Sequence, residues 1–447
     1  MTASVVRRWS ARIGLDQHVV SMLLFRGWAT IAGAVSVVLA PIWLSPTDQG
    51  YYYTFGSVLA LQIFFELGLN QIVLQLASHE VAHLSMSPGG VFEGGDPQLG
   101  RLASLARMLT RWYSIAALLF GVVGGSAGAV FFMRKGVLPP SAWLGVWLLL
   151  VASTAANLFL SPRLALMEGC GLVGQVARLR LKQSIAGYVL LWTLLASGAG
   201  LWAAASIPLA GAAGTSLWLR SNGRALRWLE RRAPDPLHRL QWRLDVLPFQ
   251  WRIAVSWISG YFIFNLFTPL IFSRHGAIEA GKLGLALTIF GAASTIGMSW
   301  VNAKTPLLTA MISRQERVPL NALFRNVALR SILVTGAICI CVVLGDAALT
   351  LLGVPLTRRV ASLSVLCVLA AVTTTNVIVF CMATYMRAHR EEPMLAQSVT
   401  TAVLIGIAAL WGSRVSVLAM MSLYLAIVML ISLPWTAWLF TRYYRRS

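Results

Sequence analysis

Residues 142–162 read AWLGVWLLLVASTAANLFLSP, and no charged side chain interrupts them. An α-helix needs about 20 consecutive apolar residues to cross the hydrocarbon core of a bilayer. The stretch has this length, so it predicts a transmembrane helix, which we extend to residue 168. Runs of the same character recur along the chain, so this segment sets the expectation for the whole fold.

The composition agrees with a membrane protein. Of the 447 residues, 57% are hydrophobic and 11% are charged. A soluble domain carries about 25% charged residues, so most of this surface is expected to face lipid. The five cysteines lie in or beside apolar runs without metal-ligand spacing, and we expect neither a metal site nor a cofactor.

Twelve apolar runs predict transmembrane helices. They cover residues 19–44, 52–77, 112–133, 142–168, 183–198, 200–219, 250–273, 277–300, 327–352, 360–386, 394–412 and 415–440. We therefore predict an all-α polytopic membrane protein with about 12 transmembrane helices.

The basic residues are distributed unevenly between the two sides of this topology. With the N-terminus inside, 28 of the 36 Lys and Arg residues lie in inner segments and 6 in outer ones, and Arg26 and Lys282 lie within spans. Positive residues concentrate on the cytoplasmic side, so both termini are expected in the cytoplasm. Anionic membrane lipids then explain the net charge of +21, and we expect no nucleic-acid partner.

The longest polar stretch runs from Arg220 to Trp242 and contains Pro234 and Pro236. It separates six predicted spans from six others. We therefore predict an N-terminal six-helix bundle at 1–219, a basic cytoplasmic linker at 220–249 and a C-terminal six-helix bundle at 250–447. The linker is expected to tether the halves and to contact lipid headgroups.

The two halves share a faint pattern. In each, a basic residue early in a helix is followed by a proline near its far end, and a dipeptide ending in glycine opens the next helix. The residues are Arg26, Pro41 and Gln49-Gly50 in the first half, and Arg252, Pro269 and Ala280-Gly281 in the second. Duplicated halves around a central cavity are common in transporters, which favours a transporter over an enzyme.

The first predicted hairpin has a distinctive sequence. Residues 44–57 read LSPTDQGYYYTFGS, residues 61–69 read LQIFFELGL and residues 77–80 read ASHE. This segment resembles the first hairpin of bacterial polysaccharide-repeat (Wzx-type) flippases. These belong to the multidrug/oligosaccharidyl-lipid/polysaccharide exporter (MOP) superfamily, which also contains multidrug extruders and the lipid II flippase.

The resemblance implies two six-helix bundles, an N-lobe and a C-lobe, around a central cavity. It also implies alternating-access translocation of undecaprenyl-diphosphate-linked oligosaccharide across the bacterial inner membrane, for surface polysaccharide assembly. A multidrug extruder is an alternative, although the excess of cations in the membrane favours an anionic cargo. A glycosyltransferase or polymerase is a further alternative, but the outer segments are too short for the loop that such enzymes need.

Arg26 and Arg252 are the first candidates for cargo binding. A charged side chain within a membrane requires a partner or a water-filled cavity, and a guanidinium suits phosphate because its donors form a planar fork. We predict that both arginines face the cavity and bind the diphosphate of the cargo. An Arg26–Glu66 ion pair that locks the first hairpin is the alternative, and the sequence leaves both open.

Gln62, Glu66 and Asn70 are spaced four residues apart on the second span. On a regular helix they form one polar stripe, which must face protein or water in a membrane. The stripe predicts contacts with sugar hydroxyls, and Glu66 is the candidate responder to H⁺ or Na⁺. Simple helix–helix contact is the alternative.

Further basic residues are candidates for weaker contacts. Arg178 and Lys182 share a helical face and predict a basic inner mouth, and Lys282 predicts a late contact near the outer edge. Ordinary snorkelling to lipid headgroups explains all three equally well. Arg163 and Glu168 are expected to form an interfacial pair.

His79-Glu80-Val81-Ala82-His83 matches the H-E-x-x-H pattern of zinc metalloproteases. Such a site needs two histidines on one helical face, a free glutamate and a third ligand. The sequence around the motif offers only Asp96, in a predicted loop. An intramembrane metalloprotease is therefore the least favoured alternative, and no catalytic residue is predicted.

Overall fold

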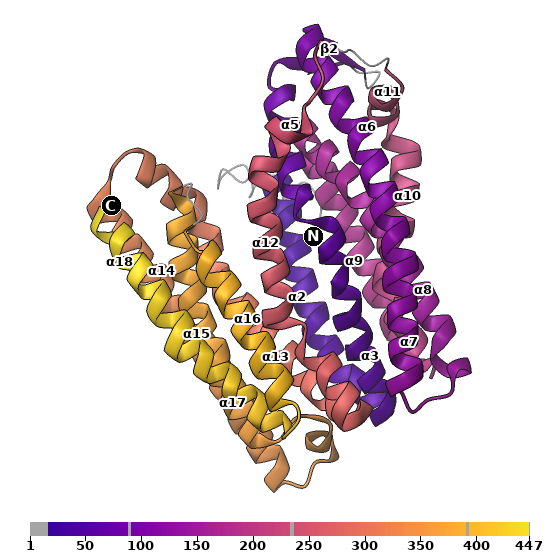
Figure 1. The fold of residues 1–447 in the computed structure, drawn as a ribbon, viewed down its shortest axis with the longest axis vertical. Coiled ribbons are helices and arrows are strands. Elements are labelled where there is room, and N and C mark those ends of the chain that lie inside the picture. The colour runs from indigo at the N-terminus through magenta and orange to yellow at the C-terminus, as the bar shows by residue number, and fades with distance from the viewer. Residues whose placement is uncertain (1–16, 88–90, 233–236, 390–392, 447) are drawn as a thin grey trace, which may run out of the picture. The chain divides into compact units, whose positions relative to one another are not determined.

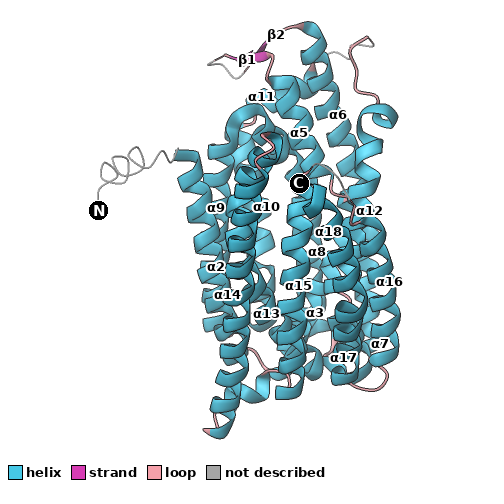
Figure 2. Ribbon diagram, turned by 90° about the vertical axis from the view of Figure 1, so that its left-hand side faces the viewer, coloured by secondary structure: helices cyan, strands magenta, loops and turns pink. Residues whose placement is uncertain are grey.

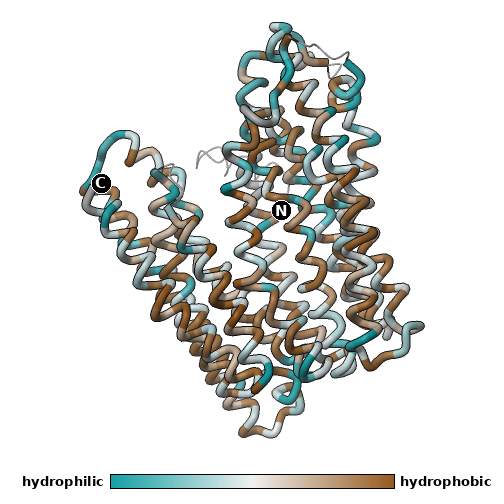
Figure 3. Tube along the Cα trace, in the orientation of Figure 1, coloured by the Kyte–Doolittle hydropathy of each residue, from teal (hydrophilic) through white to brown (hydrophobic). Residues whose placement is uncertain are grey.

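The computed structural model describes residues 17–87, 91–232, 237–389 and 393–446 (Figure 1). Figure 2 shows that nearly all of these residues are helical, with one short hairpin of strands among them. Hydrophobic residues follow the bodies of the helices, and hydrophilic residues gather mainly at helix ends and connections (Figure 3).

The first half of the chain supplies the following elements in order. They are α2 (Gln17–Trp43), α3 (Pro46–Leu59), α4 (Ile63–Glu66), α5 (Leu69–Val81), β1 (Leu84–Met86), β2 (Phe92–Gly94), α6 (Asp96–Leu119), α7 (Gly125–Lys135), α8 (Pro140–Met167), α9 (Val173–Ala196), α10 (Ser206–Asn222) and α11 (Arg224–Arg231). The strands pair antiparallel with Ser85 opposite Glu93, and the sequence pattern did not predict them.

The second half consists of helices throughout its described part. They are α12 (Leu247–Phe264), α13 (Phe267–Ser313), α14 (Arg317–Leu351), α15 (Leu363–Ala388), α16 (Leu395–Gly412), α17 (Val417–Ile427) and α18 (Leu433–Arg446).

Twelve spans can be traced through these helices. Eight described stretches are long and apolar enough to cross a membrane, and the bent pair Pro46–Glu66 and Leu69–Val81 makes a ninth. Pro140–Ala196 and Gln250–Ser313 contain 57 and 64 residues, far more than one crossing needs, and each is broken at a glycine of positive φ. Each therefore holds two spans, and α10 is the twelfth. The predicted all-α polytopic fold with about twelve transmembrane helices is confirmed.

The chain divides into two compact units. Unit 1 contains the described parts of Met1–Ser36, Leu59–Arg134 and Leu138–Trp257, and unit 2 contains those of Val37–Val58, Lys135–Val137 and Ile258–Ser447. Residues 37–58, around the first helix connection, thus pack with the second half of the chain.

The second span is not the regular helix that the polar stripe assumed. Leu67 and Gly68 both have left-handed backbone angles, and the helix axis bends by 43° there. A Cβ on Gly68 would lie 2.4 Å from Ile253 Cγ2 of α12. The break therefore depends on glycine twice, for its backbone conformation and for the close approach of α12.

The predicted linker contains a helix that packs on unit 1. Ala225, Leu226 and Leu229 are buried on one side of α11, which contacts α6. Beyond α11, Arg232 Nη2 donates to Asp96 Oδ1 at 3.0 Å. This part of the linker therefore packs as a helix within unit 1.

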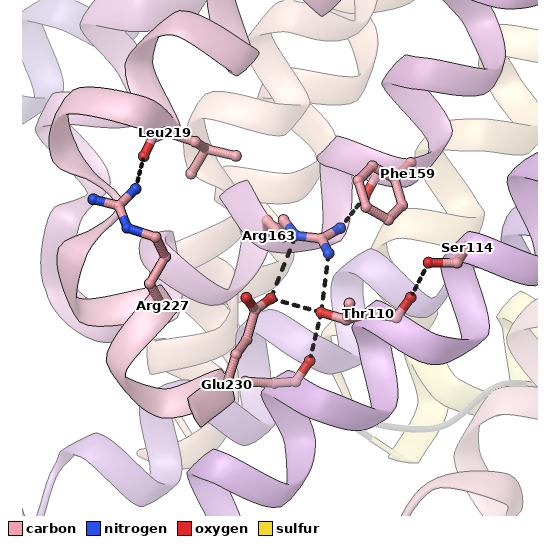
Figure 4. A network of polar contacts seen from close by, with 8 residues as sticks. Thr110, Ser114, Phe159, Arg163, Leu219, Arg227 and Glu230 are labelled. Atoms are coloured by element: carbon pink, nitrogen blue, oxygen red, sulfur yellow. Dashed lines mark hydrogen bonds and ion pairs between the residues drawn. The ribbon is translucent and has the colours of Figure 1, made fainter. Parts of the chain in front are cut away.

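Glu230 joins α11 to α6 and α8 through the polar network of Figure 4. Arg163 Nε lies 3.5 Å from Glu230 Oε1, Arg163 Nη2 donates to Thr110 Oγ1 at 3.0 Å, and Thr110 Oγ1 donates to Glu230 Oε1 at 2.6 Å. The expected Arg163–Glu168 pair was wrong, because five helical residues turn the two side chains to different faces. Glu168 pairs with Arg180 instead.

Candidate functional site

A polar cavity of about 450 Å³ lies within unit 1. Side chains from the second, fourth, fifth, sixth and seventh spans surround it. The lining residues are Glu66, Asn70, Gln71, Leu74, Asn157, Ser161, Leu164, Ala165, Glu168, Arg180, Gln183, Thr215 and Trp257. Polar groups of this number inside a membrane bundle indicate a functional site, because burying them without purpose is costly.

Glu66 and Asn70 form the polar centre of one wall. Asn70 Nδ2 donates to Glu66 Oε1 at 2.6 Å and to Ser161 Oγ at 3.1 Å. Asn70 Oδ1 is buried and has no hydrogen-bond partner among the described residues. The wall therefore presents a carboxylate and an unused amide oxygen, which are hard oxygen acceptors suited to a small cation, a proton or a hydroxyl group.

The same cavity also contains an ion pair between Arg180 and Glu168. Arg180 Nη1 and Nη2 donate to the two oxygens of Glu168 at 2.9 and 2.7 Å. A bidentate pair of this kind is strong and directional. It neutralises Glu168, so Glu66 is the carboxylate without a cationic partner on this cavity, among the residues that the structure describes.

Two glycines on α10 make room for the remaining polar groups. A Cβ on Gly214 would lie 2.7 Å from Gln183 Cγ, and one on Gly211 would lie 2.9 Å from Asn157 Oδ1. With this space, Gln183 Nε2 donates to the Gly211 carbonyl at 3.0 Å and to Thr215 Oγ1 at 2.8 Å. The small residues of α10 thus allow three helices to close around the cavity.

The structure brings together part of the predicted polar stripe. Glu66 and Asn70 line the cavity, whereas Gln62 lies in the 3₁₀ turn Ala60–Gln62 and does not line it. Sequence reasoning missed the cavity residues on the other helices. Part of their signal was present in the sequence, because Asn157 and Ser161 are four residues apart on one helical face and Thr215 interrupts the apolar run 200–219.

Arg26 is exposed on α2, in unit 1. Within the described part of the chain, the Arg26 side chain forms no ion pair and no hydrogen bond. The Arg26 backbone carbonyl accepts a hydrogen bond from Thr30 Oγ1. The alternative Arg26–Glu66 pair is therefore not formed. The guanidinium is left available for an external group.

Contacts between α2 and α9 show which residues accompany Arg26. Trp192 Nε1 donates to Ser36 Oγ at 2.9 Å, and the Tyr188 hydroxyl lies beside Gly33. The two helices thus run parallel, and at this register Arg26 lies level with Lys182. Lys182 and Arg178 are exposed, and neither lines the polar cavity.

Arg252 and Lys282 occupy different surroundings. Arg252 is exposed on α12, with its Cζ 5.5 Å from the ring centroid of Trp251 and no carboxylate partner among the described residues. Lys282 lies in unit 2, where its Nζ donates to Glu279 Oε1 at 2.7 Å. Lys282 is therefore paired, unlike the two arginines.

The two glycines of the internal repeat meet within unit 2. A Cβ on Gly50 would lie 2.0 Å from the Ala277 carbonyl oxygen, and one on Gly281 would lie 2.8 Å from Gly50 N. Gln49 Nε2 donates to the Gly281 carbonyl at 3.0 Å, and the Tyr51 ring packs edge-on against Phe272. The distinctive Gln-Gly-Tyr sequence is thus explained by close packing of α3 on α13.

The H-E-x-x-H sequence does not form a metal site in the structure. Glu80 is buried, with Arg101 Nε 3.0 Å from its Oε1, whereas the His79 side chain is 78% exposed. No group of three or more potential metal ligands occurs among the described residues. Glu80 is engaged by Arg101, so it is unsuited to act as a general base.

No protein-family model and no curated protein matches the chain. Solved structures do match over nearly its whole length. An inward-facing multidrug resistance MATE family transporter of the MOP superfamily matches with a TM-score of 0.60 and 13% identity, over 95% of this chain and 96% of that one.

Two further structures agree with this match. The lipid II flippase MurJ, in an inward closed conformation, has a TM-score of 0.61 at 11% identity, over 93% of this chain and 86% of its own. The MATE multidrug transporter DinF-BH has a TM-score of 0.59 at 15% identity, over 94% of this chain and 95% of its own. At these identities the comparison shows the fold, and the chain has the fold of MOP-superfamily transporters.

Proposed function

We propose that this multi-pass membrane protein is a flippase of the bacterial inner membrane, with both termini in the cytoplasm. Its cargo is undecaprenyl-diphosphate-linked oligosaccharide for surface polysaccharide assembly, moved by alternating access. The observation that carries the proposal is that Arg26 and Arg252 are exposed and have no carboxylate partner among the described residues. Both lie on helices of a transporter fold.

The energetics support an anionic cargo. An arginine at the centre of a membrane helix costs about 2.5–3.5 kcal/mol on insertion scales, so an unpaired arginine within a span, such as Arg26, needs a water-filled surrounding or a ligand. A diphosphate supplies several charged oxygens, and each guanidinium can bind two of them. Arg178 and Lys182, which are exposed on α9, add to the electrostatic attraction for an anionic cargo.

The polar cavity of unit 1 supplies a second part of the proposal. Glu66 has no cationic partner among the described residues, and Asn70 Oδ1 beside it accepts no hydrogen bond there. We assign H⁺ or Na⁺ coupling to Glu66, with the neighbouring hydroxyls and amides as further ligands. Gln62 lies outside this cavity, so it enters the proposal only as a contact for sugar.

Complementation of a deletion strain tests the proposed cargo. The Arg26→Gln/Arg252→Gln double variant should lose at least about tenfold of surface polysaccharide, since each charge-assisted contact contributes roughly tenfold in binding. Lipid-linked oligosaccharide should accumulate in the cells. The control is Arg325→Gln/Arg330→Gln, which removes two exposed arginines from α14. Full export by the first double variant, at equal protein levels, would exclude the proposal.

A multidrug extruder is the second candidate, and one observation favours it. A mainly apolar cavity of about 340 Å³ in unit 2 is lined by Phe264, Phe267, Phe290, Phe380 and Tyr424. Aromatic side chains of this kind suit flat apolar molecules. If the protein is an extruder, the deletion strain will become sensitive to such drugs while its surface polysaccharide stays unchanged.

A further inference from the structure

A second polar cavity, of about 700 Å³, lies in unit 2. Three connections close around it, at the Gly276 break, at the 3₁₀ turn Pro355–Arg359, and at the start of α17. In the proposed orientation these connections are all on the outer side. This cavity shares no lining residue with the unit 1 cavity.

The charged lining of this cavity is mainly cationic. Lys282 and Arg358 line it beside the imidazole of His275, and Glu279 is the one carboxylate among its described lining residues. Arg358 is exposed and has no ion-pair partner in the described part of the chain. His275 Nε2 lies 2.8 Å from the Ser413 carbonyl oxygen, and since a carbonyl can only accept, this nitrogen carries a proton.

The pairing of Lys282 leaves donors unused. Its Nζ binds Glu279 Oε1 at 2.7 Å, but an ammonium group has three donors, so two remain. Glu279 offsets one positive charge, and Arg358 supplies another that nothing offsets among the described lining residues. An anion in the cavity would therefore meet two cationic side chains and the free donors of both.

A helix terminus adds to this electropositive character. α15 starts directly after Ser362, which lines the cavity and makes no side-chain capping bond. The first N–H groups of a helix lack intrahelical acceptors and favour an anion. By contrast, Ser416 Oγ on the same cavity already accepts from Ala419 N, at 3.0 Å.

We propose that the unit 2 cavity binds a phosphate-type anion through Arg358 and Lys282, with His275 and the start of α15 as further donors. The proposal rests on the flippase function only in naming the source, which is the diphosphate of the cargo on arrival at the outer side. An anionic phospholipid headgroup or free phosphate would present the same chemistry.

Pyrophosphate binding to the full-length protein in detergent tests this site directly. To remove the two arginines that are proposed to bind the diphosphate in unit 1, all proteins carry Arg26→Gln/Arg252→Gln. Three are compared, namely this background, the background with Lys282→Gln/Arg358→Gln, and the background with Arg274→Gln/Arg414→Gln. The last pair removes two exposed arginines from the neighbouring connections that do not line the cavity. The readout is the unfolding temperature against pyrophosphate concentration at constant ionic strength.

The expected result is a saturable rise in unfolding temperature in the background and in the Arg274/Arg414 control. The Lys282/Arg358 variant should need at least about tenfold more pyrophosphate, and its unchanged elution volume and ligand-free unfolding temperature would show that it folds. Equal responses from all three proteins, or no saturable response in the background, would overturn the proposal.

Lipid nanodiscs distinguish the sources of the anion. If phosphatidylglycerol nanodiscs remove the Arg358-dependent pyrophosphate response while phosphatidylcholine nanodiscs keep it, the site binds headgroups. If the response persists in both kinds of nanodisc, the site binds a diphosphate or free phosphate and not lipid headgroups. These results are independent of export, so failure of this site and failure of the flippase proposal are measured separately.

Discussion

Glu66 lies on a polar cavity of unit 1, with one oxygen bound by Asn70 and no cation beside it among the described residues. Glu168, on the same cavity, is held by two hydrogen bonds from Arg180. The two carboxylates therefore differ in their capacity to bind a proton or a sodium ion. Glu66 can take up a proton or sodium ion from water, whereas Glu168 is already neutralised.

The Glu66→Gln variant tests this difference. Gln keeps an oxygen that accepts from Asn70, so we expect the unfolding temperature to change by less than about 4 °C. Export should nevertheless lose its dependence on the proton or sodium gradient, because the charge that responds to the ion is gone. The measurement is transport against imposed gradients, with Glu168→Gln as the control. Unchanged ion dependence in Glu66→Gln would remove this residue from coupling.

The contact between Arg163 and Glu230 leads to a second prediction about a single residue. Arg163 is 8% exposed, so Glu230→Gln leaves a nearly buried guanidinium without its counter-charge. We expect a loss of about 1–3 kcal/mol in the free energy of unfolding, measured by denaturant titration in detergent. Glu316→Gln is the control, since its pair with Arg314 is largely exposed and contributes about 0.5 kcal/mol or less. Similar losses in both variants would contradict this assignment.

At the scale of elements, the packing of α3 on α13 depends on glycine. Gly50 and Gly281 allow the two backbones to touch, and Gln49 ties them together by a hydrogen bond to the Gly281 carbonyl. Packing this close leaves no room for a side chain at either glycine.

Gly50→Ala is therefore expected to destabilise the protein. The added Cβ would lie 2.0 Å from the Ala277 carbonyl oxygen, so the helices must separate, at a cost of about 1–3 kcal/mol. Gly56→Ala, on the same helix with nothing within 4 Å of the added Cβ, should instead stabilise by up to about 1 kcal/mol. Unfolding in detergent measures both. Equal effects of the two substitutions would show that the contact is not tight.

At the scale of the whole molecule, the sequence predicted the helices better than their breaks. Long apolar runs determine a crossing because hydrocarbon admits little else, so the twelve spans could be placed. The break at Leu67–Gly68 could not, because it depends on Ile253, far away in the chain. For the same reason Glu66 and Asn70 were identified, but Arg180 and Gln183 were not, since only packing decides which face of α9 meets the cavity.

The fold itself leaves the cargo open. Structures of multidrug transporters and of a lipid II flippase match the chain about equally well, and one fold serves many chemistries. The nature of the cargo must therefore be inferred from the side chains. The unpaired Arg26 and Arg252 of unit 1 favour a negatively charged cargo over a cationic drug.

Reconstituted transport is the decisive measurement for an anionic cargo. Proteoliposomes would contain a fluorescent undecaprenyl-diphosphate-linked oligosaccharide, and a membrane-impermeant reagent would report its movement between leaflets. We predict rapid movement with the wild type and at least about tenfold slower movement with Arg26→Gln/Arg252→Gln, while Arg325→Gln/Arg330→Gln moves it normally. If the Arg26→Gln/Arg252→Gln variant moves the cargo at the wild-type rate, these two arginines do not bind it.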